Sequence, residues 1–163
     1  MSIEEDFTEI YHMHAAKVYS LCLGYASGDE MLAKDWQQET FVKVWNHRKS
    51  FKGHSAIGTW IYRIAVNVCL SDLRKPKLQR LSNDRMPPAE AEDTEERSQD
   101  EKLKKMYRCI NQLTEQNKAL ILLELEEIPQ ATIAETVGLA HGAVRTRLSR
   151  IRKALLKCMT NGK

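Results

Sequence analysis

The sequence lacks any long apolar run. The best one, Ala119 to Leu123, is followed at once by Glu124, and a membrane-spanning helix needs roughly 20 apolar residues. The N-terminus carries Glu4, Glu5 and Asp6, whereas a secretory leader begins with positive charge. Both absences predict a protein that stays in the cytoplasm.

Closely spaced metal or disulfide motifs are also absent. The four cysteines, Cys22, Cys69, Cys109 and Cys158, lie far apart and form no Cys-x-x-Cys pair. We therefore expect four buried thiols in a reducing compartment. The sequence has no glycine-rich phosphate loop, no metal-spaced cluster and no evident nucleophile–base pair, so it predicts no metal site, no cofactor and no enzymatic activity.

Charge is unevenly distributed along the chain. The net charge is +3, but residues 1–75 balance 9 basic with 9 acidic side chains, and residues 76–101 hold 4 basic and 8 acidic ones. Residues 102–163 hold 12 basic and 5 acidic side chains, and from His141 onward seven Lys or Arg occur without a single acid. A basic terminus on a nearly neutral chain indicates a polyanionic partner.

Strand patterns are nearly absent, and helical periodicity recurs instead. A first helix is predicted over residues 7–25, a second from a cap at Asp29 to about Lys49, and a third from the loop 51–58 to before Pro76. Helices resume near Glu101, and Thr114 is expected to cap the next one. The fold class is therefore all-α.

The composition changes between residues 76 and 100. This stretch holds Pro87-Pro88 and a run of five acids between residues 90 and 96, and its periodicity is weak. We interpret it as an acidic, flexible linker, with an ordinary solvated loop as the alternative. The predicted organisation is two small helical domains, residues 1–75 and 101–163, joined by residues 76–100.

The C-terminal segment has the pattern of a helix-turn-helix. Pro129 fits the start of a short helix, and Gly138 can end it in a left-handed turn. Ala134 allows close approach of a second helix, which starts near His141 and buries Val144 with the later apolar residues of its stripe.

The opposite face of that second helix is polar and basic, as a major-groove reader requires. A basic solvated helix is the alternative, but the short helix, the glycine turn and the lack of acids favour DNA binding. The predicted duplex-binding residues are Arg145, Thr146, Arg147, Ser149, Arg150 and Lys153, with Arg152 and Lys157 beside them.

The third predicted helix also has two faces. Its apolar face includes Ile61 and Val68, whereas another side carries Trp60, Arg63 and Asn67. An aromatic ring, a cation and an amide together suit unstacked bases and a single-strand backbone. A tryptophan at such a place is also common in an ordinary core.

The order of these motifs resembles the extracytoplasmic-function (ECF) sigma factors of the main bacterial sigma-factor family. Three segments carry the resemblance. The first is Asp35-x-x-Gln38-Glu39-x-Phe41-x-Lys43-Val-Trp45. The second is Phe51-Lys-Gly-His-Ser55 followed by Thr59-Trp60-Ile-Tyr62-Arg63-Ile-Ala-Val-Asn67. The third runs from Leu113 to Lys157, so that nearly the whole chain except the linker is covered.

The resemblance implies a role for each segment. The core polymerase would be bound, at the clamp helices of its largest subunit, by Asp35, Gln38, Glu39 and Lys43. The single-stranded −10 element would be bound by Phe51, Ser55, Trp60, Arg63 and Asn67, and all of these except Arg63 would form the pocket for a flipped base. The basic helix would read the −35 duplex near the polymerase flap, the acidic linker would follow the RNA path, and an anti-sigma factor would regulate the protein.

Two departures from the family pattern affect specificity. His54 stands where members often carry an acid, and Pro129-Gln-Ala-Thr132 replaces a commoner Ser-Tyr-Glu-Glu-like helix start. The alternatives are a stand-alone helix-turn-helix regulator, which leaves the first two motifs without a purpose, and an enzyme, which nothing in the sequence supports.

Overall fold

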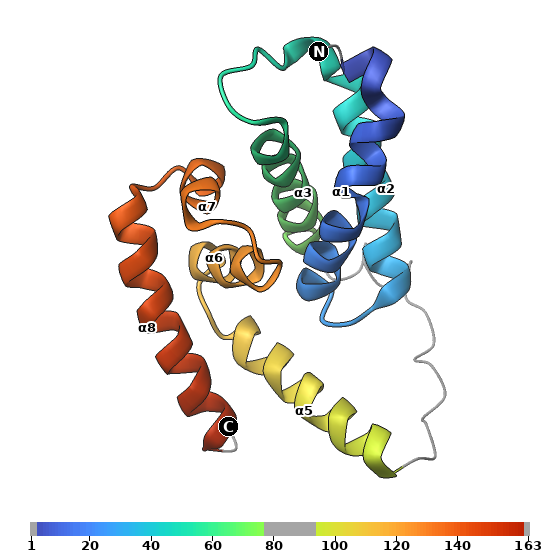
Figure 1. Cartoon of the computed structure of the whole chain (residues 1–163). Coiled ribbons are helices and arrows are strands. Elements are labelled where there is room, and N and C mark those ends of the chain that lie inside the picture. Colours follow the sequence, from blue (N-terminus) through green and yellow to red (C-terminus); the bar gives the residue numbers. More distant parts are fainter. Residues whose placement is uncertain (1–2, 77–93, 162–163) are drawn as a thin grey trace.

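The computed structural model describes residues 3–76 and 94–161, and these residues form seven α-helices and one short 3-10 helix (Figure 1). The first half contains α1 (Ile3–Tyr25), α2 (Glu30–Asn46), η1 (Arg48–Ser50) and α3 (Ile57–Leu73). The second half contains α5 (Thr94–Asn111), α6 (Glu115–Leu125), α7 (Gln130–Val137) and α8 (His141–Thr160). None of these helices combines the length and the apolar character that crossing a bilayer requires.

Local sequence explains where the helices of the first half begin and end. The carboxylate of Asp29 accepts a hydrogen bond from the backbone N–H of Leu32 at 3.1 Å, which confirms Asp29 as the cap of α2. The turn before it contains Ser27 and Gly28, both with positive φ. Helix α2 ends at Asn46, before the predicted Lys49, because the chain tightens there into η1.

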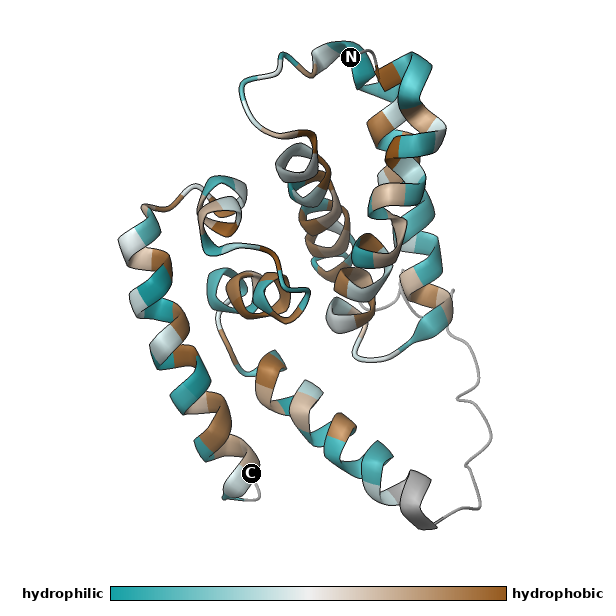
Figure 2. Cartoon of the chain, viewed as in Figure 1, coloured by the Kyte–Doolittle hydropathy of each residue, from teal (hydrophilic) through white to brown (hydrophobic). Residues whose placement is uncertain are grey.

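The three helices of the first half pack around one apolar core (Figure 2). Val18, Val44 and Ile61 are fully buried contributions from α1, α2 and α3. Trp36 is also buried, and its Nε1–H donates to Oδ2 of Asp72 at 3.1 Å. This bond satisfies the indole donor and ties α2 to the end of α3.

Helix α5 begins at Thr94, seven residues before the predicted start at Glu101. The segment Thr-Glu-Glu-Arg-Ser-Gln-Asp at residues 94–100 contains several good helix formers, so helical propensity extends α5 into the stretch interpreted as linker. The rest of that stretch, residues 77–93, lies outside the described residues. Thr114 caps α6 as expected, since its hydroxyl oxygen accepts from the N–H of Asn117 at 3.2 Å.

The turn between α7 and α8 has the predicted geometry. Gly138 adopts φ 78°, and its N–H donates to the carbonyl of Ala134 at 2.8 Å. The N–H of Leu139 also reaches the carbonyl of Ala134, at 3.0 Å. The left-handed residue therefore closes α7 and redirects the chain into α8, whose Val144 is buried as predicted.

The cysteine prediction is wrong for two of the four residues. Cys22 and Cys69 are buried free thiols as expected, but Cys109 and Cys158 form a disulfide between α5 and α8. The two cysteines are 49 residues apart in the sequence, and contact between their helices arises only from the tertiary fold. The sequence pattern therefore could not predict this disulfide. In the chain-entropy description, closing a loop of this length stabilises the folded state by roughly 4 kcal/mol.

The two halves of the molecule contact each other through α3 with α7 and through α1 with α6. Nζ of Lys17 donates to the carbonyl of Glu126 at 2.6 Å. Gly24 permits close approach, since a Cβ there would lie 2.6 Å from Cδ2 of Leu122. At the rim, the guanidinium of Arg74 forms a two-pronged ion pair with Glu115.

Candidate functional site

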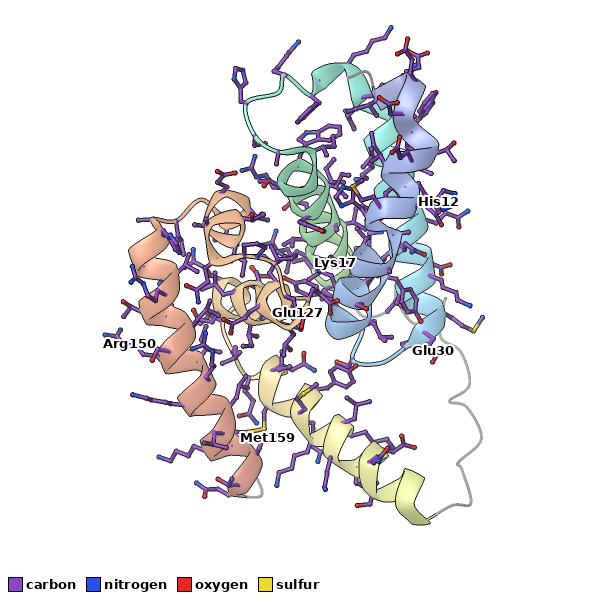
Figure 3. All side chains as sticks on the ribbon, viewed as in Figure 1. His12, Lys17, Glu30, Glu127, Arg150 and Met159 are labelled. Atoms are coloured by element: carbon purple, nitrogen blue, oxygen red, sulfur yellow. A yellow bond between two sulfur atoms is a disulfide. The ribbon has the colours of Figure 1, made fainter. Side chains whose placement is uncertain are left out.

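Helix α8 presents one polar, basic face to solvent. Val144, Leu148 and Ile151 are buried against the rest of the second half. The side chains on the other side of the helix are exposed, and Arg150 points away from all neighbouring helices (Figure 3). The exposed members of the predicted duplex-binding set are Arg145, Thr146, Ser149, Arg150 and Lys153.

Two other arginines of α8 turn back toward α6. Arg147, a predicted duplex-binding residue, is half-buried and donates to Oε1 of Gln116. Arg152 pairs with both carboxylate oxygens of Glu124, and the hydrogen bond to this carboxylate raises the pKa of Arg152. The basic face therefore has an outer row directed at solvent and an inner row that fixes α8 on α6.

Helix α2 carries the four predicted polymerase-binding residues on one side. Asp35, Gln38, Glu39 and Lys43 are all exposed, and their spacing of three and four residues places them on one side of the helix. Phe41 lies on the opposite side and is buried against Tyr11, with ring centroids 4.8 Å apart. The sequence pattern thus separates a polar contact face from the packing face.

The loop before α3 brings two of the predicted single-strand residues together. The rings of Phe51 and Trp60 are half-buried, with centroids 5.2 Å apart. Ser55 lies in the same loop and is half-buried, whereas His54 is exposed. Phe51 and Trp60 form an aromatic pair at the N-terminal end of α3.

Arg63 and Asn67 lie further along α3, next to the second half of the molecule. Nε of Arg63 donates to the carbonyl of Thr136 at 3.3 Å, and its Nη2 donates to the carbonyl of Glu135. Asn67 is exposed and lines, with Arg63, a hollow of about 260 Å³ between α3, α6 and the end of α7. The five predicted residues are therefore split between the half-buried pair Phe51 and Trp60 with Ser55 in the same loop, and two exposed polar residues that lie next to the second half.

The contacts of Arg63 with α7 were missed by the sequence reasoning. Its two acceptors are backbone carbonyls 72 and 73 residues away. Every residue has a backbone carbonyl, so the residue type does not show which carbonyl will accept a hydrogen bond. A guanidinium at the C-terminal end of a helix fulfils two needs, because it satisfies free carbonyls and complements the negative end of the helix dipole. In the sequence, these contacts are indicated by no more than an arginine on the polar side of the third predicted helix.

Pro129 is compatible with the start of α7, although it departs from the residue that is commoner there in the family. It stands at the cap position of α7 with φ −57°, and its carbonyl accepts from the N–H of Ile133 at 2.9 Å. Its missing N–H removes a donor that would have no partner inside the helix.

Across the described part of the chain, no group of three or more His, Cys, Asp or Glu side chains is placed to hold a metal ion.

Two family models match the chain, one in each half. Sigma-70 region 2 matches residues 10–79, and Sigma-70, region 4 matches residues 103–155. The RNA polymerase sigma factor YlaC of Bacillus subtilis is 34% identical over 137 residues, which span 80% of this chain and 79% of that protein. The ECF RNA polymerase sigma-E factor of Escherichia coli K12 is 34% identical over 160 residues, spanning 85% of this chain and 78% of that protein.

Solved structures show the same fold. CnrH, solved in complex with the cytosolic domain of CnrY, superposes with a TM-score of 0.73 at 19% identity, over 98% of this chain and 91% of that chain. RpoE of Bartonella quintana, solved with the anti-sigma factor NepR, gives 0.69 at 21% identity, over 96% and 98%. The matching regions, the curated relatives and the helix-turn-helix agree: the chain belongs to the sigma-70 family and is an RNA polymerase sigma factor of the ECF type, a DNA-binding initiation factor and not an enzyme.

Proposed function

We propose that three exposed faces divide the work of promoter-directed initiation. In this proposal α2 binds core RNA polymerase, the N-terminal end and outer side of α3 bind the single-stranded −10 element, and α8 reads the −35 duplex. The proposed domains are residues 1–75 and 101–163, joined by residues 76–100, of which the part from Thr94 onward belongs to α5, and the protein acts in the cytoplasm. The observation that carries the proposal is the separation on α8 of buried Val144, Leu148 and Ile151 from an exposed basic face.

The outer row of α8 has the chemistry of base readout. Arg145 and Arg150 can donate two hydrogen bonds to the edge of a guanine, and Ser149 can pair with several bases. The inner row suits phosphates, since Arg147 and Arg152 are positioned by α6 at the margin of the face. The second half of the molecule would lie near the polymerase flap when α8 occupies the major groove.

The assignment of Arg150 can be tested on promoter duplexes. Arg150→Ala is expected to reduce discrimination between a matched −35 element and a single-base variant by about tenfold, on the order of 1–3 kcal/mol. Lys104→Ala is the matched control, because Lys104 is an exposed cation on α5 in the same half. Equal weakening of Arg150→Ala on every duplex would show that Arg150 contacts phosphate instead.

The polar stripe of α2 is the proposed contact with the polymerase clamp helices. Its residues are exposed, comprise two acids, one amide and one lysine, and stand on a helix fixed by buried Trp36 and Phe41. Glu39→Arg is expected to weaken binding to core polymerase at least tenfold in a fluorescence titration, because it reverses a charge at the centre of the contact. Glu9→Arg, on the exposed side of α1, should bind normally, and equal loss in both variants would refute the assignment.

The −10 pocket is proposed at the N-terminal end of α3. A flipped base can stack on the Phe51–Trp60 pair beside Ser55, while Arg63 and Asn67 follow the strand backbone. Trp60→Ala is expected to reduce binding of the single-stranded non-template −10 sequence by about 1–3 kcal/mol, the usual worth of one stacked base. Unchanged affinity would show that Trp60 serves the fold alone.

Simultaneous promoter contacts require the two halves to separate. The −35 and −10 elements lie roughly 85 Å apart along B-form DNA, at about 3.4 Å per base pair. In the structure Arg63 of the proposed −10 face is hydrogen-bonded to α7, which packs directly on α8. Binding to polymerase and promoter must therefore break the contacts of Arg63 with Glu135 and Thr136, and α3 and α8 must move apart.

A reconstitution tests the whole proposal. The purified chain, added as the only sigma factor to core polymerase, should direct run-off transcription from a limited set of promoters, and mapping their start sites would define both elements. Duplex binding by the chain alone, without specific initiation, would favour a stand-alone regulator. An anti-sigma partner is proposed because the two structural neighbours above were solved with NepR and with the cytosolic domain of CnrY.

A further inference from the structure

The four cysteines form two pairs, one in each half of the molecule. Cys22 and Cys69 face each other between α1 and α3 with Sγ atoms 3.7 Å apart. Both are fully buried, and the hydrogen bond to Cys22, together with burial, raises the pKa of Cys69. A protonated, inaccessible thiol is a poor nucleophile, so this pair is expected to stay reduced.

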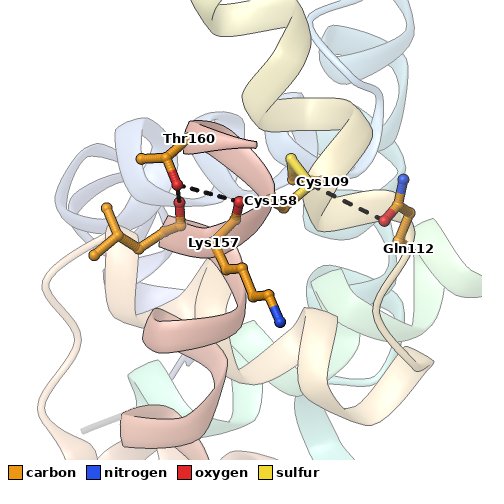
Figure 4. Close-up of a disulfide and its surroundings, with 6 residues drawn as sticks. Cys109, Gln112, Lys157, Cys158 and Thr160 are labelled. Carbon is orange, nitrogen blue, oxygen red and sulfur yellow. Dashed lines mark hydrogen bonds between the residues drawn. A yellow bond between two sulfur atoms is a disulfide. The ribbon is translucent and has the colours of Figure 1, made fainter. Parts of the chain in front are cut away.

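The second pair lies at the edge of the fold. Cys109 is near the C-terminal end of α5 and is 2% exposed, whereas Cys158 is two residues before the end of α8 and is half-buried (Figure 4). The disulfide between them is therefore open to attack at the sulfur of Cys158. Oε1 of Gln112 lies 4.0 Å from this sulfur and is placed to accept a hydrogen bond once the sulfur carries a proton.

Helix α8 is packed unevenly along its length. Its three buried residues, Val144, Leu148 and Ile151, all lie in the first eleven positions. Beyond Ile151 the packing is looser, because Leu155 is only partly buried against the core and Leu156 is 65% exposed. The disulfide is thus the strongest restraint on the last two turns of α8, directly after the proposed DNA-reading residues Arg150 and Lys153.

We propose that the Cys109–Cys158 disulfide is a thiol-controlled cross-link that sets the affinity of region 4 for the −35 duplex. Oxidised, it fixes the C-terminal part of α8 on α5 and holds the reading face in one orientation. Reduced, it lets the end of α8 separate from α5, so that a smaller fraction of molecules presents the face correctly. This inference rests on the proposed reading of the −35 element by α8.

Exchange with low-molecular-weight thiols such as glutathione accounts for every atom and electron. The first thiolate attacks Sγ of Cys158 and forms a mixed disulfide, and the S–S bond breaks to release the thiolate of Cys109, which takes up a proton. A second thiolate attacks the small-molecule sulfur of the mixed disulfide and releases Cys158 as a thiol. Two small thiols are oxidised to one disulfide while two electrons reduce the protein. Disulfides in cytosolic proteins are usually of this reversible kind.

The test uses the full chain assembled with core polymerase and equilibrated in glutathione buffers of different thiol-to-disulfide ratio. Mass spectrometry of the peptides measures the Cys109–Cys158 bond, and fluorescence anisotropy measures binding to a matched promoter duplex. Affinity should fall about fivefold as this bond is reduced, with the same midpoint in both measurements. Hydrogen exchange of the free chain should rise over residues 152–160 in the reduced form and little over 141–151.

Two variants separate this cross-link from other thiols. Cys158→Ser should bind like the reduced chain in every buffer, which also accounts for thiols of the polymerase itself. Cys22→Ala should keep the full redox response. Equal affinity in the oxidised and reduced wild-type chain, or a response that persists in Cys158→Ser, would overturn the cross-link proposal while leaving duplex reading intact. Absence of promoter binding in both states would overturn the reading of the −35 element itself.

Discussion

The left-handed turn at Gly138 gives a sharp test of the helix-turn-helix. Gly138 has φ 78°, and apart from the glycine itself and its two chain neighbours no atom lies within 4 Å of the place a Cβ would occupy. Gly138→Ala therefore introduces no clash, and its effect comes from backbone conformation alone. Placing a side chain in the left-handed region costs roughly 1–2 kcal/mol, offset in part by the lower entropy of the unfolded alanine chain. We expect a net loss of about 1 kcal/mol in the free energy of unfolding.

Gly142 provides the matched control four residues later. It lies in the first turn of α8, and the space for a Cβ is equally empty. Gly142→Ala should stabilise the protein by about 0.5 kcal/mol, because alanine is the better helix former. Gly138→Asn should lose only about half as much as Gly138→Ala, since asparagine tolerates the left-handed region.

Urea denaturation followed by circular dichroism measures these differences. With a denaturant dependence of about 2 kcal/mol per molar, Gly138→Ala lowers the midpoint by about 0.5 M and Gly142→Ala raises it by about 0.25 M. The two substitutions are chemically identical, so the opposite signs isolate the backbone. Midpoints that move in the same direction for both variants would refute the role assigned to the turn.

Three further predictions concern the first half and the contact between the halves. Burial lowers the pKa of His14. As the pH drops, the unfolded chain therefore takes up the proton before the folded chain does, and the free energy of unfolding falls below about pH 6.5. In urea titrations, His14→Phe should lose less stability than wild type between about pH 7.5 and 5.5. Trp36→Phe removes the hydrogen bond to Asp72 and leaves a small void, so it should destabilise by about 2 kcal/mol in the same assay, and Asp72→Asn, which keeps an acceptor oxygen, by less. Arg74→Ala should leave the midpoint unchanged at physiological salt, because its pair with Glu115 is exposed; a clear shift would contradict this.

Features governed by neighbouring residues could be predicted from the sequence. The caps at Asp29 and Thr114 and the turn at Gly138 depend on side chains and backbone within four residues, and the structure confirms all three. The burial of Val144 and Leu148 follows from helical spacing for the same reason. The early start of α5 was missed because the acidic residues near 94–100 suit both a solvated linker and a helix.

Features that join distant segments could not be predicted. The Cys109–Cys158 pair needs α5 and α8 to meet at their C-terminal ends, and nothing in the spacing of the cysteines indicates this. The capping of α7 by Arg63 depends on backbone carbonyls of the other half. The exposed faces of α2 and α8 could be assigned as candidates, because amphipathic periodicity shows which side is free. Which parts of the α3 face are covered depends on how the halves meet.

The disulfide also has a mechanical consequence. It closes a covalent ring that contains α6, α7 and nearly all of α8, while the chain leading to the first half joins α5 outside this ring. A pull applied through residue 94 while α8 is held by DNA would pass from α5 through the sulfur bridge to the end of α8. About 49 residues, or roughly 170 Å of extended chain, would remain locked until the bridge is reduced. In the oxidised state the helix-turn-helix would therefore move as one body when the halves are drawn apart along a promoter.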